Sequence, residues 1–203
     1  MKTIRSFLAL DLSLATARAL ADLQRTLADR LSGTRTRVRW VAPQNLHVTI
    51  AFLGQVTEPM TASLSNLLAP AAAAVAPFDM TCGGLGAFPD ERHPRVLWAG
   101  VTSPAEELEG LHRRVTEILG ETGFDMKDEL FRSHVTIGRV REVEDGGLAP
   151  CFDEDLSGDF GRTRVKDLAC YRSDLDPRGA DYHLLWRLPL TGRSAAAEPQ
   201  AKE

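Results

Sequence analysis

The chain has 203 residues and a mass of 22.2 kDa, with 24 lysines and arginines against 28 aspartates and glutamates, so its formal net charge is −4. Hydrophobic residues make up 43% of the chain and charged residues 26%, which is typical of a globular protein and excludes wholesale disorder. The mild acidity also argues against a protein that coats nucleic acid through bulk charge, so any contact with RNA has to be local.

The first half of the chain reads as strands and helices in turn. Residues 4–10 form a short apolar run that predicts a strand, and Ser13 can cap a helix that ends before Gly33. Strands are expected over 35–41, 46–53 and 78–82. Between the last two, a helix should begin at Thr57 to Pro59 and be interrupted or ended by Pro70.

The second half repeats the order of strand, capped helix, glycine and strand. A strand is expected over 95–101, a helix from Ser103 to near Gly123, and a strand over 130–140. An acidic, glycine-rich loop should cover 142–159, before strands over 164–171 and 182–190. Residues 1–192 are predicted to form one domain, and the polar tail 193–203 to be disordered.

The cysteines and the apolar segments favour a cytoplasmic protein. Cys82, Cys151 and Cys170 form an odd set without a CxxC pair, which indicates a reducing compartment. Asp11 interrupts the N-terminal apolar run, so this run predicts a strand and not a signal peptide. No stretch reaches the roughly 18 to 20 apolar residues of a membrane span. We expect no membrane contact, no obligate protein partner and a monomer.

The tetrapeptide His-Val-Thr-Ile occurs twice, at 47–50 and at 134–137. Side chains alternate faces along a strand, so each histidine shares a face with the threonine two residues later, while valine and isoleucine enter the core. By the same parity Phe52 is expected in the core and Ala51 on the cleft face. A duplication kept for strand packing would explain valine and isoleucine, but packing does not require histidine.

Two His-x-Thr strands that face one cleft suit phosphodiester cleavage. A pair of imidazoles supplies a base and an acid near neutral pH. The hydroxyls of Thr49 and Thr136 can hold the phosphate oxygens, so His47 and His134 need no metal and no cofactor.

The sequence resembles the 2H phosphoesterases, which are named for two HxTx motifs, and among them the RNA 2′,3′-cyclic phosphodiesterases, also called 2′-5′ RNA ligases. The resemblance extends from about residue 4 to 190. It includes FLALDL at 7–12, RWVAPQNLHVTIAFLG at 39–54, GLGAFP at 84–89, PRVLWAGV at 94–101 and FRSHVTIGRV at 131–140. It implies an α+β fold of two pseudo-symmetric lobes of antiparallel sheet and helices, with the two HxTx strands lining a central cleft.

The resemblance also implies a role for each site residue. His47 would be the proton donor to the leaving 3′ oxygen and His134 the proton acceptor from water, with Thr49 and Thr136 on the phosphate. The substrate would be an RNA end with a 2′,3′-cyclic phosphate, such as a tRNA fragment, and the product a 2′-phosphate. The alternatives are a 2′-5′ RNA ligase, a phosphodiesterase for small cyclic nucleotides or 2′-5′ oligonucleotides, and an RNA-end binding module without catalysis.

Further residues are candidates for contacts with phosphate or RNA. Arg132 lies two residues before His134 and on the same face, so it is a candidate phosphate ligand. Arg139 has the opposite parity and reaches the cleft only if Gly138 allows a bulge. The roles of four other residues stay open at this point: Arg35, Arg37 and Arg39 as a basic rim, and Phe88 as a stacking surface for a base.

Overall fold

The computed structural model describes residues 2–103, 105–126, 131–143, 148, 151–152, 158–176 and 179–193. Its strands are β1 (Thr3–Asp11), β2 (Arg37–Trp40), β3 (His47–Thr57), β4 (Phe78–Phe88), β5 (Val96–Ser103), β6 (His134–Glu142), β7 (Asp159–Val165), β8 (Asp167–Asp176) and β9 (Gly179–Pro189). Its helices are α1 (Leu14–Arg30), α2 (Glu58–Ala73), α3 (Ala105–Glu121) and the short 3₁₀ helix η1 (Pro43–Asn45). Most of the predicted loop 142–159 and of the tail 193–203 lies outside the described residues.

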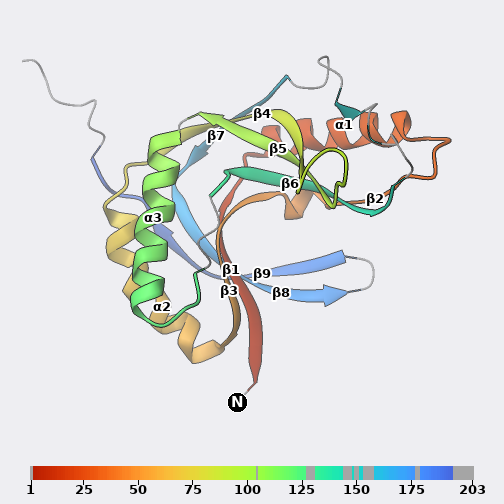
Figure 1. Ribbon diagram of the computed structural model, residues 1–203. Coiled ribbons are helices and arrows are strands. Elements are labelled where there is room, and N and C mark those ends of the chain that lie inside the picture. Colours follow the sequence, from red (N-terminus) through yellow and green to blue (C-terminus); the bar gives the residue numbers. More distant parts are fainter. Residues whose placement is uncertain are drawn as a thin grey trace, which may run out of the picture.

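All strands belong to one antiparallel sheet in the order β7-β4-β5-β6-β3-β1-β8-β9, and β2 pairs with β6 at one side. The sheet curls around its middle, where β3 and β6 meet through the pair Val48 and Val135 (Figure 1). On either side of this junction the chain repeats one unit, since β1, α1 and β3 correspond to β5, α3 and β6. The predicted α+β class with an antiparallel sheet is confirmed, and the junction places the two HVTI strands side by side.

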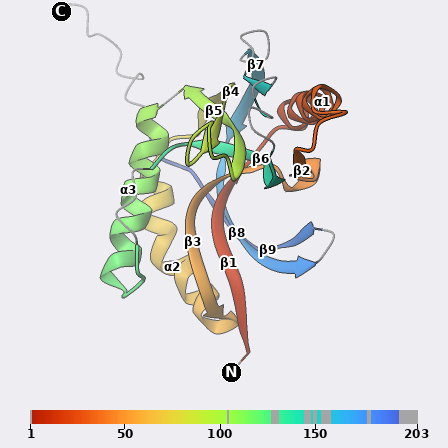
Figure 2. The same ribbon diagram turned by 45° about the vertical axis from the view of Figure 1, so that its right-hand side comes forward.

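The helices cover the outer surface of the sheet on two sides. α1 packs against β6 and β7, whereas α2 packs against β9 and β3 and also against α3. Figure 2 shows α2 and α3 together on one side of the curled sheet and α1 on the other. Between helices and sheet lies a core that includes the fully buried Leu8, Leu27, Leu97, Leu111 and Ile137. Among the described residues, no helix is both long and apolar enough to cross a membrane.

Two helix predictions meet different outcomes. Ser13 caps α1 as predicted, because its side chain accepts a hydrogen bond from the backbone N–H of Thr16 at 3.1 Å. The expectation that Pro70 interrupts or ends the second helix is wrong, since α2 runs through Pro70 to Ala73. Pro70 stands in the last turn and lacks the N–H that would donate to the carbonyl of Asn66, yet the helix continues to Ala73.

Two strand predictions were wrong, one at a break between two strands and one in a glycine-rich segment. The single strand expected over 164–171 is two strands, β7 and β8, separated at Lys166. β4 extends to Phe88, beyond the expected end at Cys82, through several glycines that resemble a loop in sequence. Close packing explains why residue 86 is a glycine. A Cβ there would lie 2.2 Å from the Trp98 ring, so the indole occupies the space that a side chain would fill.

Candidate active site

The two histidine–threonine pairs line one cavity of about 650 Å³ on the concave side of the sheet. His47 and Thr49 come from β3, and His134 and Thr136 come from β6. The junction of the two half-sheets therefore brings together residues that lie far apart in sequence. The remaining walls come from β1, from β2 and η1, and from β8 and β9.

Each histidine is oriented by a backbone carbonyl two residues before it. Nδ1 of His47 lies 2.7 Å from the carbonyl oxygen of Asn45, and Nδ1 of His134 lies 2.6 Å from that of Arg132. A carbonyl can only accept, so Nδ1 carries the proton and donates it in both residues. The neutral imidazoles therefore keep the lone pair on Nε2. At His47 this Nε2 accepts from the Thr49 hydroxyl at 3.0 Å.

Aromatic rings hold both imidazoles from the side. The ring of His47 lies 4.8 Å from Phe7 and 5.4 Å from Tyr182, measured between ring centroids. The ring of His134 meets Phe88 edge-on at 4.9 Å and lies 6.3 Å from Trp98. These contacts restrict the rotation of the imidazoles and keep them in a partly apolar environment.

Burial lowers the pKa of both histidines from 6.5. The hydrogen bond from Nδ1 to the carbonyl opposes this effect in both, because it favours the protonated ring. For His47 the charge of Asp11 also raises the pKa, whereas His134 and Arg139 lower it. Burial is the largest cause, so both histidines of the free protein favour the neutral form.

A β-bulge follows the threonine of each motif and changes which residues face the cavity. In β3, Thr49 and Ala51 pair with the adjacent residues Ala9 and Leu8, so Ile50 is the extra residue. The alternation reverses there, and the predicted faces of the next two residues are wrong. Ala51 is in the core with 5% exposure. Phe52 is 63% exposed and lines the cavity.

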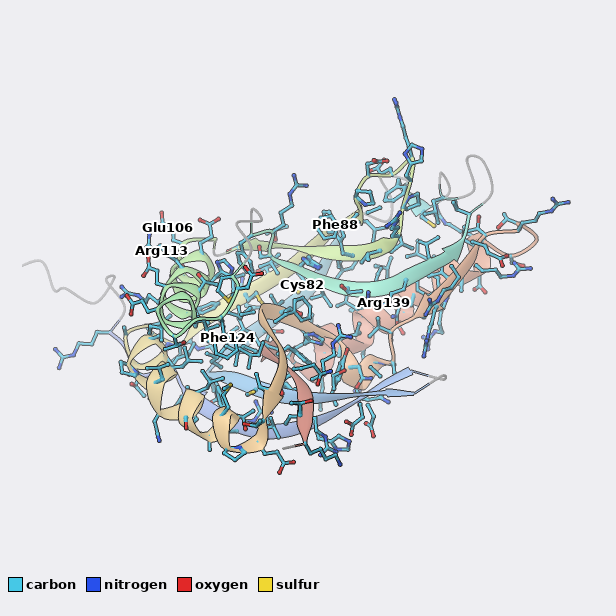
Figure 3. All side chains as sticks on the ribbon, turned by 60° about the horizontal axis from the view of Figure 1, so that its bottom comes forward. Cys82, Phe88, Glu106, Arg113, Phe124 and Arg139 are labelled. Carbon is cyan, nitrogen blue, oxygen red and sulfur yellow. The ribbon has the colours of Figure 1, made fainter. Side chains whose placement is uncertain are left out.

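The same bulge in β6 brings Arg139 into the cavity. Thr136 and Gly138 pair with the adjacent residues Trp98 and Leu97, so Ile137 is the extra residue. This is the local break that the sequence required for Arg139, which lines the cavity together with Arg141. Figure 3 shows Arg139 between β6 and the β8–β9 hairpin.

The cavity is basic although the whole chain is acidic. Four arginines line it, and Asp181 is the one acidic residue among those lining residues; the arginines are Arg5, Arg39, Arg139 and Arg141. Sequence reasoning missed Arg5 and Tyr182, because β1 and β9 reach the cavity only through the curl of the sheet. It missed Arg141 because this residue follows the bulge in β6, two residues after Arg139. Among the described residues, no three His, Cys, Asp or Glu side chains gather as a metal site would require.

Other predicted candidates lie outside this cavity. Arg132 lines a separate hollow of about 630 Å³ with Trp98 and Arg92, and it is its backbone carbonyl that meets His134. Phe88 contacts His134 and Trp98 and is not a lining residue. Of the three arginines around β2, only Arg39 lines the cavity; Arg37 donates to the carbonyl of Thr34 at 2.9 Å, and Arg35 is exposed.

Several known proteins are similar to this chain in sequence. An RNA 2′,3′-cyclic phosphodiesterase of Archaeoglobus fulgidus is 34% identical over 179 residues, which are 88% of this chain and 96% of that protein. One of Methanothermobacter thermautotrophicus is 32% identical over 180 residues, which cover 88% and 95% of the two chains.

Solved structures agree in fold. A protein of Thermus thermophilus superposes with a TM-score of 0.73 at 29% identity, covering 94% of this chain and 100% of the other. Escherichia coli LigT, complexed with 3′-AMP, superposes with a TM-score of 0.70 at 24% identity, covering 94% and 99%. The family model of LigT-like phosphoesterases matches residues 10–98 and 100–180. The chain, with its two His-x-Thr pairs on one cavity, belongs to the LigT-like phosphoesterase family.

Proposed function

We propose that this protein is an RNA 2′,3′-cyclic phosphodiesterase that opens a terminal cyclic phosphate to a 2′-phosphomonoester. The observation that carries the proposal is the pair of imidazoles that face one basic cavity, each held at Nδ1 by a carbonyl and each followed by a threonine hydroxyl. The names of relatives at 34% and 32% identity support the same substrate class.

In the proposed reaction His134 takes a proton from water through Nε2, and the water oxygen forms a bond to phosphorus. The bond between phosphorus and the 3′ oxygen breaks, and His47 gives its Nε2 proton to that oxygen. Asp11 supports the assignment of His47 as the acid, because it pairs with His47 across β1 and β3 and its charge favours the imidazolium. The negative phosphate in the cavity adds to this effect.

The non-bridging phosphate oxygens accept hydrogen bonds from Thr49 and Thr136, and Arg139 balances their charge. The Thr49 hydroxyl donates to His47 in the free protein, so it turns to the phosphate when substrate binds. Phe52 and Tyr182 offer apolar ring faces to the nucleoside in the same cavity. Arg132 has no part in this scheme beyond its carbonyl, because its side chain lines the other hollow.

The RNA partner is an end with a cyclic phosphate, such as a tRNA fragment, and contact with it concentrates on the terminal nucleotide, where the arginines gather. The described cysteines, Cys82, Cys151 and Cys170, are all free and buried, which supports a reducing, cytoplasmic compartment. Neither a metal nor a cofactor takes part in the proposed steps.

The test is incubation of the whole chain with an oligoribonucleotide that ends in a 2′,3′-cyclic phosphate, with and without EDTA and a second RNA with a 5′-hydroxyl. We expect a 2′-phosphate as the product, at the same rate in EDTA. A joined RNA would identify a 2′-5′ ligase. Binding without turnover would identify a binding module, and loss of activity in EDTA would contradict the metal-independent mechanism.

A further inference from the structure

Asn45 connects His47, the proposed acid, to the wall of the cavity that β9 forms. Its backbone carbonyl accepts the Nδ1 proton of His47 at 2.7 Å. Its side-chain amide donates from Nδ2 to the carbonyl of Ala180 at 2.6 Å, at the start of β9. Its backbone N–H donates to the carbonyl of Ala42 at 2.8 Å, which closes η1. The peptide group that orients His47 is thus connected to β9 by a single side chain.

The wall that Asn45 holds is also a contact surface of His47. Tyr182, three residues after Gly179 on β9, meets the imidazole at 5.4 Å with its ring nearly perpendicular to it. Gly179, Ala180, Asp181 and Tyr182 all line the cavity. His47 therefore meets β9 twice, directly through Tyr182 and indirectly through Asn45.

The other histidine has a different arrangement. The carbonyl that holds His134 belongs to Arg132, whose side chain lines the separate hollow and not the wall of the catalytic cavity. Both imidazoles thus donate to a carbonyl two residues earlier, but only the residue that carries the carbonyl for His47 is bonded through its side chain to the cavity wall. His134 serves as an internal reference for any change at His47.

We propose that Asn45 is a positioning residue: by bonding to Ala180 it fixes the carbonyl that keeps the proton of His47 on Nδ1 and aims Nε2 at the substrate. The tautomer of a histidine follows the hydrogen bond made by its other nitrogen, so a displaced carbonyl frees the ring to adopt the other tautomer. Small misplacements of a catalytic group lower the rate much more than they weaken substrate binding.

The first test measures the imidazole tautomers by long-range ¹H–¹⁵N NMR in the wild type, in Asn45→Ala and in Asn66→Ala. Asn66 is an exposed asparagine on α2, so its variant controls for the loss of a surface amide. We expect His47 of Asn45→Ala to leave the pure Nδ1–H tautomer while His134 keeps it. An unchanged tautomer of His47 in folded Asn45→Ala would overturn the proposal. This readout needs no turnover, so it stands apart from the proposed phosphodiesterase activity.

The second test is kinetic and rests on the proposed role of His47. We expect kcat of Asn45→Ala to fall roughly 10- to 100-fold with KM changed less than about threefold, since a positioning error acts on the transition state. Asn45→Gln, which keeps an amide donor, should recover part of kcat. A raised KM with unchanged kcat, or equal loss in Asn45→Gln and Asn45→Ala, would show that Asn45 only shapes the wall.

Discussion

The two His-Val-Thr-Ile strands have the same local geometry and different neighbours. In both, Nδ1 donates to the carbonyl two residues earlier and a bulge follows the threonine. At the fifth residue after the histidine, β3 presents Phe52 to the cavity and β6 presents Arg139. Asp11 pairs with His47, whereas Gly100 occupies the corresponding place beside His134. Under the proposed mechanism, identical tetrapeptides therefore supply the acid and the base. Residues on the neighbouring strands determine which histidine acts as the acid and which as the base.

The largest expected effect separates the acid from the base. His47→Ala and His134→Ala should each lower the rate on a cyclic-phosphate RNA by roughly 10²- to 10⁴-fold. On a p-nitrophenyl ester of a nucleoside 2′-phosphate, whose leaving group departs without a proton, His47→Ala should regain most of the rate and His134→Ala should not. The measurement is release of nitrophenolate. Equal recovery by both variants would contradict the assignment, and the exposed His93→Ala is the control.

A smaller effect contrasts two arginines on opposite sides of the second motif. Arg139→Ala should lower kcat/KM roughly 10- to 100-fold, because under the proposed mechanism a charged hydrogen bond to the phosphate is lost. Arg132→Ala should change it less than about threefold, since its side chain lines another hollow. Steady-state kinetics on the same RNA decide between them. A greater loss of kcat/KM in Arg132→Ala than in Arg139→Ala would indicate that the Arg132 side chain contacts the substrate.

The bulge in β3 can be tested through stability. Ala51→Lys should lower the free energy of unfolding by on the order of 2 kcal/mol or more, because the new ammonium would enter the core. Phe52→Lys, at the exposed neighbouring position, should change it by less than about 1 kcal/mol. Urea denaturation gives both values. If Ala51→Lys were as stable as the wild type and bound phosphate more tightly, Ala51 would face the cavity.

The smallest effect concerns pH. Because burial lowers the pKa of His47 and His134, both should titrate below 6.5 in an NMR titration of the free protein. The unfolded chain then binds more protons than the folded one as the pH falls below 6.5, so acid lowers stability. Inorganic phosphate in the cavity should raise the midpoint of His47, since the anion favours the imidazolium. A midpoint above 6.5 without phosphate would contradict the role given to burial.

The sequence by itself determined the candidate chemistry and the class of fold. The repeated His-x-Thr spacing marks one strand face in each half of the chain, and the alternation of strands with capped helices predicts an α+β protein. These features depend on residues close in sequence, where the period of the backbone is fixed.

Only the tertiary structure decided what surrounds the two histidines. The bulges at Ile50 and Ile137 depend on pairing with β1 and β5, so parity alone misplaced Ala51 and Phe52 and left Arg139 open. The basic cavity and the link from Asn45 to Ala180 arise because the sheet curls and brings β1, β2 and β9 around the junction. Such contacts join residues far apart along the chain, and no local pattern encodes which strand will be the neighbour.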